Sequence, residues 1–163
     1  MPSLITERSL PAMKLVGIAA NFNPIDSPDA NGNEVIPEIW SNLFDALDDV
    51  DEFEFGWAVG VMVPATGADA KPGQLEYFAG LVVDATPDEL GILKVREVAA
   101  SDYVVCEHIG EIDDLPETTA WFYTDYLPNS GIAQKQAPHL EVYDERFDPE
   151  SDHSVVMICA PKQ

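Results

Sequence analysis

The sequence predicts an α+β fold built from two β-α-β-β halves, with curved antiparallel sheets, two helices packed on one side and a central ligand groove. Two observations support this fold. The order strand, helix, strand, strand occurs twice along the chain, and each predicted helix carries a proline where its first turn is expected. The chain has 163 residues, of which 46% are hydrophobic, which suffices for one domain with its own core. We therefore expect a single domain over residues 1–163, with pseudo-repeats over about 12–83 and 93–160.

The first half opens with a short apolar strand over residues 13–21, MKLVGIAAN. A helix is expected to follow, with Pro37 in its first turn, where a missing amide hydrogen costs nothing. Its apolar positions recur at helical spacing and form one face, made of Ile39, Trp40, Leu43, Phe44 and Leu47. The first strand is expected to start at about residue 12, and nothing before it fits a helix-turn-helix. The chain is therefore expected to contain the ligand-binding part alone.

A strand and its neighbour complete the first half. Residues 55–63, FGWAVGVMV, alternate large residues with small ones such as Gly56 and Gly60, which leaves room on one face of the strand. That room is a candidate pocket. Residues 75–83, LEYFAGLVV, are expected to form the antiparallel partner.

The second half follows a polar break at residues 84–90. Strands are expected at 103–108, around 140–143 and at 155–160. Between the first two, Asp114-Leu-Pro-Glu117 has the spacing of a capping box with proline in the first turn, which predicts a helix start. Pro128 predicts that the helix ends at Leu127.

The charge of the chain restricts its partners. Its 30 Asp and Glu residues against 8 Lys and Arg give a formal net charge of −22. Such a surface repels nucleic-acid phosphates and anionic membranes, and attracts cationic ligands or basic protein patches. Adaptation to a saline habitat is an alternative reason for the same acidity. Without a signal peptide or a long apolar run, the protein is expected to be cytoplasmic.

The cysteines and histidines do not suggest a metal site or a cofactor. Cys106 and Cys159 lie in separate apolar strands without Cys-x-x-Cys spacing, so buried thiols are expected. The histidines are scattered, and Ser130 and Ser154 lack the setting of a nucleophile elbow. We expect no cofactor and a binding protein rather than an enzyme.

One carboxylate stands out in residues 131–147, GIAQKQAPHLEVYDERF. Glu141 lies inside an apolar and aromatic strand, and Tyr143 and His139 share its face because strand side chains alternate. A carboxylate removed from water needs a cation or hydrogen-bond donors. Glu141 could instead point to solvent on an edge strand, or be held permanently by Arg146 or by tyrosine hydroxyls.

Four segments with distinctive residues follow one another along the chain: Val35-Ile-Pro-x-x-Trp40-x-x-Leu43-Phe44, Tyr77-Phe-Ala-Gly80-Leu-Val-Val, Tyr103-Val-Val-Cys-Glu-His108-x-Gly110, and Trp121 to Ser130 with Glu141-Val-Tyr143-Asp144. In this order they resemble the GyrI-like, or AraC-type effector-binding, family of small-molecule-binding domains. The resemblance covers nearly the whole chain. It implies two β-α-β-β units that bind amphipathic, often cationic, small molecules over a buried glutamate beneath aromatic rings.

By position Glu141 matches that glutamate. The ligand-binding residues expected on this basis are Glu141, Tyr143, Tyr77, Tyr103, Trp57 and Trp121; Trp40 is a further candidate for the lining. The implied function is a stand-alone sensor or sequestering protein for hydrophobic, cationic compounds, of the kind found in transcription regulation and multidrug binding.

The resemblance leaves two alternatives and one cofactor question. Some GyrI-like members are hydrolases of strained electrophiles, so Glu141 could act as a general acid or base assisted by Tyr103 or Tyr77. The family's namesake inhibits DNA gyrase, so the acidic surface could instead dock on a basic protein. The haem-associated SOUL proteins have a similar fold, but His108 and His139 lack neighbours at ligand spacing, so no haem is expected.

Overall fold

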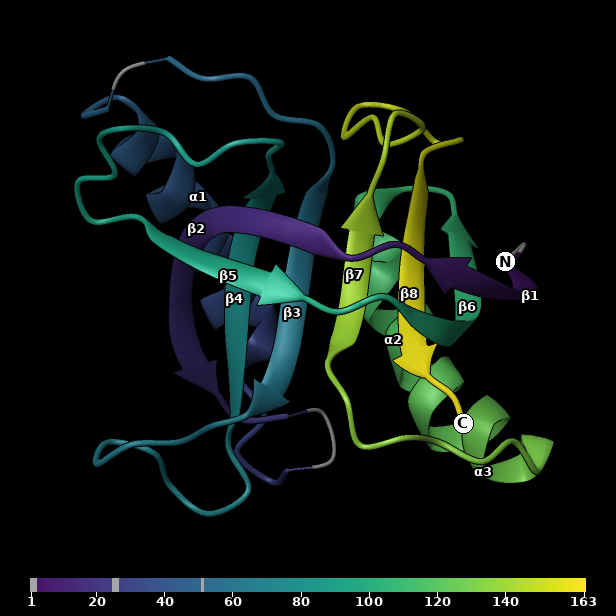
Figure 1. The fold of residues 1–163 in the computed structure, drawn as a ribbon. Helices are drawn as coiled ribbons and strands as arrows, with labels where there is room; N and C mark the ends of the chain where they lie inside the picture. The colour runs from purple at the N-terminus through teal and green to yellow at the C-terminus, as the bar shows by residue number, and fades with distance from the viewer. Residues whose placement is uncertain (1–2, 25–26, 51) are drawn as a thin grey trace. The chain divides into compact units, whose positions relative to one another are not determined.

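The computed structural model describes residues 3–24, 27–50 and 52–163. It is an α+β protein whose contacts divide it into two compact units. Unit 1 comprises residues 1–12 and 99–163, and unit 2 comprises residues 13–98. Both units contain an antiparallel sheet with helical structure packed on one face (Figure 1).

Unit 2 contains strands β2 (Met13–Phe22), β3 (Ala58–Pro64), β4 (Leu75–Val82) and β5 (Lys94–Val98), with helix α1 (Gly32–Leu47). The strand order is β5-β2-β4-β3, and every pairing is antiparallel. Ile39, Leu43 and Ala46 of α1 are buried against the sheet. The predicted strands at 13–21 and 75–83 are confirmed, and the strand predicted at 55–63 begins three residues later.

Helix α1 differs from its prediction at two residues. It begins at Gly32, so Pro37 lies inside the helix and not in its first turn. Phe44 is 50% exposed, although it was expected on the packed face. The buried stripe follows Ile39, Leu43 and Ala46, which is the four- and three-residue spacing of one helix face, and Phe44 lies one position off it.

Unit 1 contains strands β1 (Ser3–Leu10), β6 (Ser101–Ile109), β7 (His139–Tyr143) and β8 (Val155–Pro161) in the order β1-β6-β8-β7. Its helical segment runs through η1 (Ile112–Asp114), α2 (Leu115–Trp121), η2 (Phe122–Tyr126) and α3 (Leu127–Ser130). The three strands predicted in this half are confirmed. The core between sheet and helices includes Phe122 and Leu127 on the helical side and Cys106 and Ile158 on the sheet side.

Strands β1 and β5 were not predicted. The structure shows β1 where the sequence suggested no strand before residue 12, and β5 follows the polar break at 84–90. Both lie at the edge of their unit's sheet and carry charged residues at exposed positions, which obscures the alternation that would identify a strand. β1 pairs with β6, and β5 pairs with β2. The two units therefore have matching strand orders, β1-β6-β8-β7 and β5-β2-β4-β3.

The helical segment of unit 1 also departs from its prediction. Asp114 is the N-cap of α2 but makes no side-chain capping bond, so the predicted capping box does not form. The helix does not end at Leu127. The π-helical turn η2 ends at Tyr126, and α3 continues through Pro128 to Ser130. Pro128 has no amide hydrogen for a regular α-helical bond, and a wider turn at this point lets the chain continue. The segment ends at Gly131, whose left-handed φ of 75° caps the helix.

Candidate functional site

Strand β7 places Glu141 on the helix-covered face of the unit 1 sheet. Glu141 lies opposite Ile158 of β8, and Ile158 lies opposite Cys106 of β6. Directly opposite residues of an antiparallel sheet point to the same face. Ile158 and Cys106 belong to the core beneath the helices, so Glu141 points to that core and is only 6% exposed. The alternative that Glu141 points to solvent is therefore wrong.

Tyr123 of the π-helical turn lies over the same part of β7. Its hydroxyl is 3.0 Å from Nδ1 of His139, and the two ring centroids are 5.4 Å apart. Burial, followed by the negative charge of Glu141, raises the pKa of Tyr123 well above its ordinary value of 10.0. Burial lowers the pKa of His139 from 6.5. At neutral pH the pair therefore consists of a protonated phenol and an uncharged imidazole.

Tyr143 completes this group. Its hydroxyl donates to Oε1 of Glu141 over a long distance of 3.4 Å, and its ring meets that of Phe147 edge-on with centroids 4.9 Å apart. We call Glu141, Tyr143, Tyr123 and His139 the carboxylate site. It combines one buried acidic group with two tyrosines and a histidine, a composition suited to a cation with apolar surface.

Two other predicted site residues of unit 1 do not share this face. Tyr103 is 1% exposed and lies opposite Pro161, on the face of the sheet that Glu107 also occupies. Burial, with a smaller contribution from Cys159, raises the pKa of Tyr103 to about 12. Trp121 is on α2, is 40% exposed and packs against Tyr126 at a centroid distance of 5.4 Å. Tyr103 cannot assist Glu141 through the sheet, so that part of the catalytic alternative is wrong.

The remaining two predicted residues belong to unit 2. Tyr77 is fully buried under α1, and its hydroxyl accepts a hydrogen bond from the indole of Trp40 at 3.0 Å. Trp57 lies just before β3, and its carbonyl accepts a hydrogen bond of 2.9 Å from the backbone amide of Val82. The candidate pocket beside Gly60 is filled, because a Cβ at Gly60 would lie 2.0 Å from the Tyr77 hydroxyl. Tyr77 therefore packs in the core of its own unit.

Tyr123 was missed by the sequence interpretation, which selected Trp121 two residues earlier. A regular helix rotates about 100° per residue, so an amphipathic pattern places residues on a face only while that rotation holds. The π-helical turn alters the rotation between residues 122 and 126. The Leu-Pro pair at 127–128 was the one signal in the sequence of an irregularity there.

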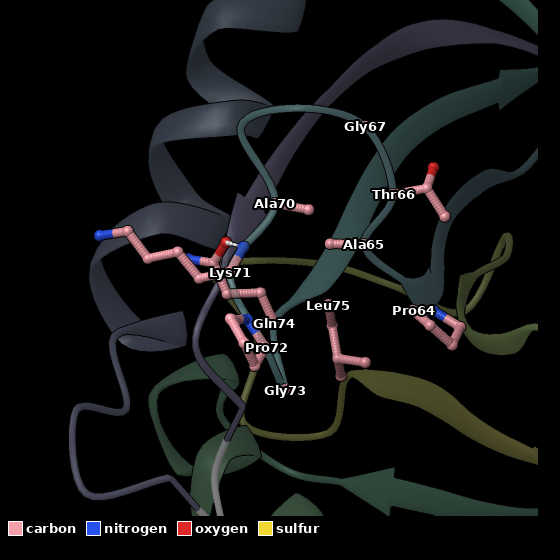
Figure 2. Close-up of a pocket in the computed structure, with 10 residues that line it drawn as sticks. All are labelled: Pro64, Ala65, Thr66, Gly67, Ala70, Lys71, Pro72, Gly73, Gln74 and Leu75. Carbon is pink, nitrogen blue, oxygen red and sulfur yellow. Dashed lines mark hydrogen bonds between the residues drawn. The ribbon is translucent and has the colours of Figure 1, made fainter.

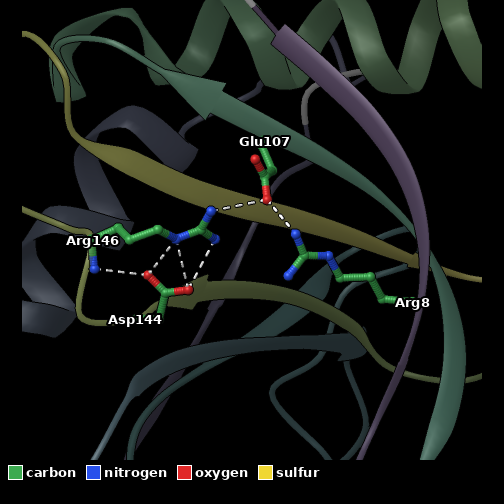
Figure 3. Close-up of polar contacts among 4 residues, drawn as sticks. All are labelled: Arg8, Glu107, Asp144 and Arg146. Atoms are coloured by element: carbon green, nitrogen blue, oxygen red, sulfur yellow. Dashed lines mark hydrogen bonds and ion pairs between the residues drawn. The ribbon is translucent and has the colours of Figure 1, made fainter.

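A second group of charges occupies the opposite face of the unit 1 sheet. Glu107 is 3% exposed, and its carboxylate accepts hydrogen bonds from Arg8 at 2.6 Å and from Arg146 at 3.1 Å (Figure 3). Arg146 also bonds Asp144 at 3.0 Å, and this bond followed by the one to Glu107 raises the pKa of Arg146. Arg146 was considered as a partner of Glu141, but its guanidinium is committed to this other face.

An open hollow of about 490 Å³ lies in the loop between β3 and β4 (Figure 2). It is lined by residues 64–67 and 70–75, and none of the predicted site residues is among them. Gln74 there is held by the Lys71 amide and by Asn23. Its lining includes Lys71 but no carboxylate, so we do not regard it as the site for a cation.

His108 and the two cysteines lie in the core of unit 1. His108 is buried between the Thr118 hydroxyl, 2.7 Å from Nδ1, and the Glu111 carbonyl, 2.8 Å from Nε2. A carbonyl only accepts, so Nε2 donates and His108 has a structural role. Cys106 and Cys159 are buried free thiols. Over the residues that the structure describes, no three His, Cys, Asp or Glu side chains are grouped as metal ligands.

A family model for the GyrI-like small molecule binding domain matches residues 5–161 of this chain. The chain belongs to this family. Comparison with curated proteins gave no match. Within the described ranges, no helix of this GyrI-like domain has the length and apolar character needed to span a membrane.

Solved structures with the same fold have low sequence identity. SAV2435 bound to tetraphenylphosphonium is 18% identical, with a TM-score of 0.73 over 98% of this chain and 94% of SAV2435. A putative bacterial transcription regulation protein from Staphylococcus aureus MU50 is 18% identical, with a TM-score of 0.67 over 98% of both chains. The EcmrR C-terminal domain is 15% identical, with a TM-score of 0.61 over 100% of this chain and 99% of that domain.

Proposed function

We propose that this GyrI-like domain binds hydrophobic organic cations at the carboxylate site and acts as a sensor or a sequestering protein. The observation that carries the proposal is the burial of Glu141 beneath Tyr123 with Tyr143 at its side. A carboxylate in such a place is stabilised by an arriving positive charge more than one in water would be. The bound tetraphenylphosphonium of SAV2435 supports this ligand class.

The aromatic rings and the overall charge favour the same ligand. Tyrosine faces attract cations by about 0.5 to 2 kcal/mol each, depending on how far the cation is desolvated. The net charge of −22 raises the local concentration of cations and repels anions of equal size. Apolar surface on the ligand would replace water at the rings, so the predicted ligand is both cationic and hydrophobic.

The test compares two ions of matched shape and opposite charge. Tetraphenylphosphonium should bind in isothermal titration calorimetry, whereas tetraphenylborate should not. Glu141→Gln keeps the shape of the side chain and removes the charge. It should weaken binding of the cation roughly tenfold or more. Glu107→Gln is the matched control, because it neutralises a buried carboxylate on the opposite face of the same sheet. Circular dichroism would confirm that both variants are folded.

Equal affinity of wild type and Glu141→Gln for the cation would contradict the assignment of the site. Equal affinity for the borate would show that hydrophobic contact, and not charge, drives binding. A loss of cation binding in Glu107→Gln as large as that in Glu141→Gln would place the site elsewhere.

Hydrolysis of a strained electrophile is a second candidate, favoured by the Tyr123–His139 hydrogen bond beside Glu141. For an epoxide, the water oxygen would attack carbon while Glu141 takes a proton from that water, and Tyr123 would protonate the departing ring oxygen to give a diol. Glu141 would then release its proton to solvent and Tyr123 would regain one from solvent. Turnover of a phenyl-substituted epoxide that is abolished in Glu141→Gln, with binding retained, would establish this role. Absence of diol from wild type under saturating epoxide would leave binding as the function.

A further inference from the structure

We propose that His139 makes cation binding at the carboxylate site pH-dependent, because its protonation would place a positive charge on the strand face that holds Glu141. This inference rests on the proposed function and adds its regulation. His139 and Glu141 are on the same face of β7, two residues apart, so their side chains are neighbours along the strand.

Among the described residues, titratable groups face His139 from the π-helical turn and from β7 itself. Tyr123 approaches from the π-helical turn, with its hydroxyl 3.0 Å from Nδ1. Glu141 and Tyr143 share its face of β7, and Tyr143 bonds Glu141 at 3.4 Å. On β8 the neighbouring positions of this face hold the core residues Ile158 and Ala160, which do not titrate. Of these groups, Glu141 is the one that carries a negative charge as a carboxylate.

Protonation of His139 changes both the charge and the hydrogen bonding of the site. In the neutral ring Nδ1 can accept from the Tyr123 hydroxyl, whereas in the imidazolium both ring nitrogens donate. The Tyr123 hydroxyl would then accept at its oxygen and turn its own hydrogen away from His139. The imidazolium charge would at the same time repel a cationic ligand on this face of the sheet, so proton and ligand would compete.

The direction of the effect follows from burial. Burial lowers the pKa of His139 from 6.5, so the ring is neutral at pH 7 to 8 and becomes charged only as the pH falls below that range. Ligand affinity should therefore be full at pH 8 and decline on acidification. Below the pKa of His139, competition by one proton weakens binding by up to about tenfold per pH unit.

The experiment measures tetraphenylphosphonium affinity from pH 8 to pH 5 for wild type, His139→Gln and His153→Gln. Glutamine does not titrate but can still bond Tyr123, and His153 is an exposed histidine that serves as the control. Wild type and His153→Gln should lose affinity on acidification, and His139→Gln should lose markedly less. A loss of affinity that depends on the His139 charge would be absent from His139→Gln, so the difference between His139→Gln and His153→Gln reports His139.

A second measurement needs no variant. The chain has three histidines, His108, His139 and His153, so their imidazole proton resonances can be assigned in NMR spectra and followed against pH. Reciprocity requires that bound tetraphenylphosphonium lower the pKa of His139. The acid dissociation constant should rise by about the same factor by which protonation weakens ligand binding. The His153 resonance reports any effect of the ligand that is unrelated to the site.

The outcomes separate the two proposals. Binding at pH 8 with identical pH profiles in wild type and His139→Gln would overturn the role of His139 and leave the proposed function intact. A His139 pKa that is unchanged by bound cation would do the same. No binding at pH 8 in any of the three proteins would overturn both proposals.

Discussion

At the scale of single residues, the small residues of β3 explain packing and not a ligand pocket. The sequence showed alternating small residues, and the structure shows that Gly60 gives room to Tyr77 of the neighbouring strand. Tyr77 meets Phe22 and Trp40 edge-on, with centroid distances of 6.2 Å to each. It is one of the largest fully buried side chains, so it has little freedom to move aside.

Gly60→Ala should therefore destabilise the fold. The new methyl group would lie 2.0 Å from the Tyr77 hydroxyl and 2.3 Å from its ring, and displacing the ring would break the bond from Trp40. We expect a loss of about 1 to 3 kcal/mol in the free energy of unfolding, measured with urea. Gly56→Ala is the control, because the nearest atom to its Cβ is 4.0 Å away. Equal stability of Gly60→Ala and wild type would show that Tyr77 does not fill this space.

Only part of the carboxylate site could be predicted from its individual residues. Glu141 and its neighbours His139 and Tyr143 follow from strand alternation, because a two-residue period fixes the face once the strand is placed. Strand alternation does not reveal Tyr123, because Tyr123 lies in a helical segment 16 residues before His139. Its position depends on the π-helical turn, which amphipathic spacing does not anticipate.

At the scale of elements, the unpredicted strand β1 is held to β6 by side chains as well as by the strand pairing. Arg8 of β1 and Arg146 of the β7–β8 loop both bond Glu107 of β6 (Figure 3). The carboxylate is 4% exposed, whereas the two arginine side chains are 39% and 36% exposed. Glu107 therefore links three segments that are distant in sequence.

Glu107→Gln should lower the free energy of unfolding by about 1 to 3 kcal/mol, because both arginines lose a charged acceptor. The loss stays in this range because both arginines remain partly solvated. Arg8→Gln should cost less, since Arg146 still bonds the buried carboxylate. Urea unfolding of the two variants would compare these losses. If Arg8→Gln proved the more damaging, Arg8 would stabilise β1 mainly by packing and not through Glu107.

At the scale of the whole molecule, the net charge of −22 acts on stability through self-repulsion. Raising NaCl from about 0.05 to 1 M shortens the screening length from above 10 Å to about 3 Å. We expect a higher Tm at high salt, and each 1 kcal/mol gained would raise it by roughly 2 to 4 °C in a chain of this size. Differential scanning calorimetry would measure the shift.

Tetramethylammonium chloride at the same ionic strength is the control for this prediction. The same rise in both salts would attribute the effect to screening, whereas a rise in NaCl alone would indicate specific sodium binding. A Tm that falls with salt would show that the few ion pairs contribute more than the repulsion among the acidic residues.

The sequence by itself determined the fold class, the main strands and the shared face of His139, Glu141 and Tyr143, because these depend on local periodicity. It predicted two repeats with a groove between them, and this part of the interpretation stays a prediction, although the strand order is the same in both units. Only the tertiary structure decided the pairing of β1 with β6, the position of Tyr123 over His139 and the filling of the space beside Gly60 by Tyr77. Each of these joins segments far apart in the chain, and a local pattern holds no information about which distant partner a residue will meet.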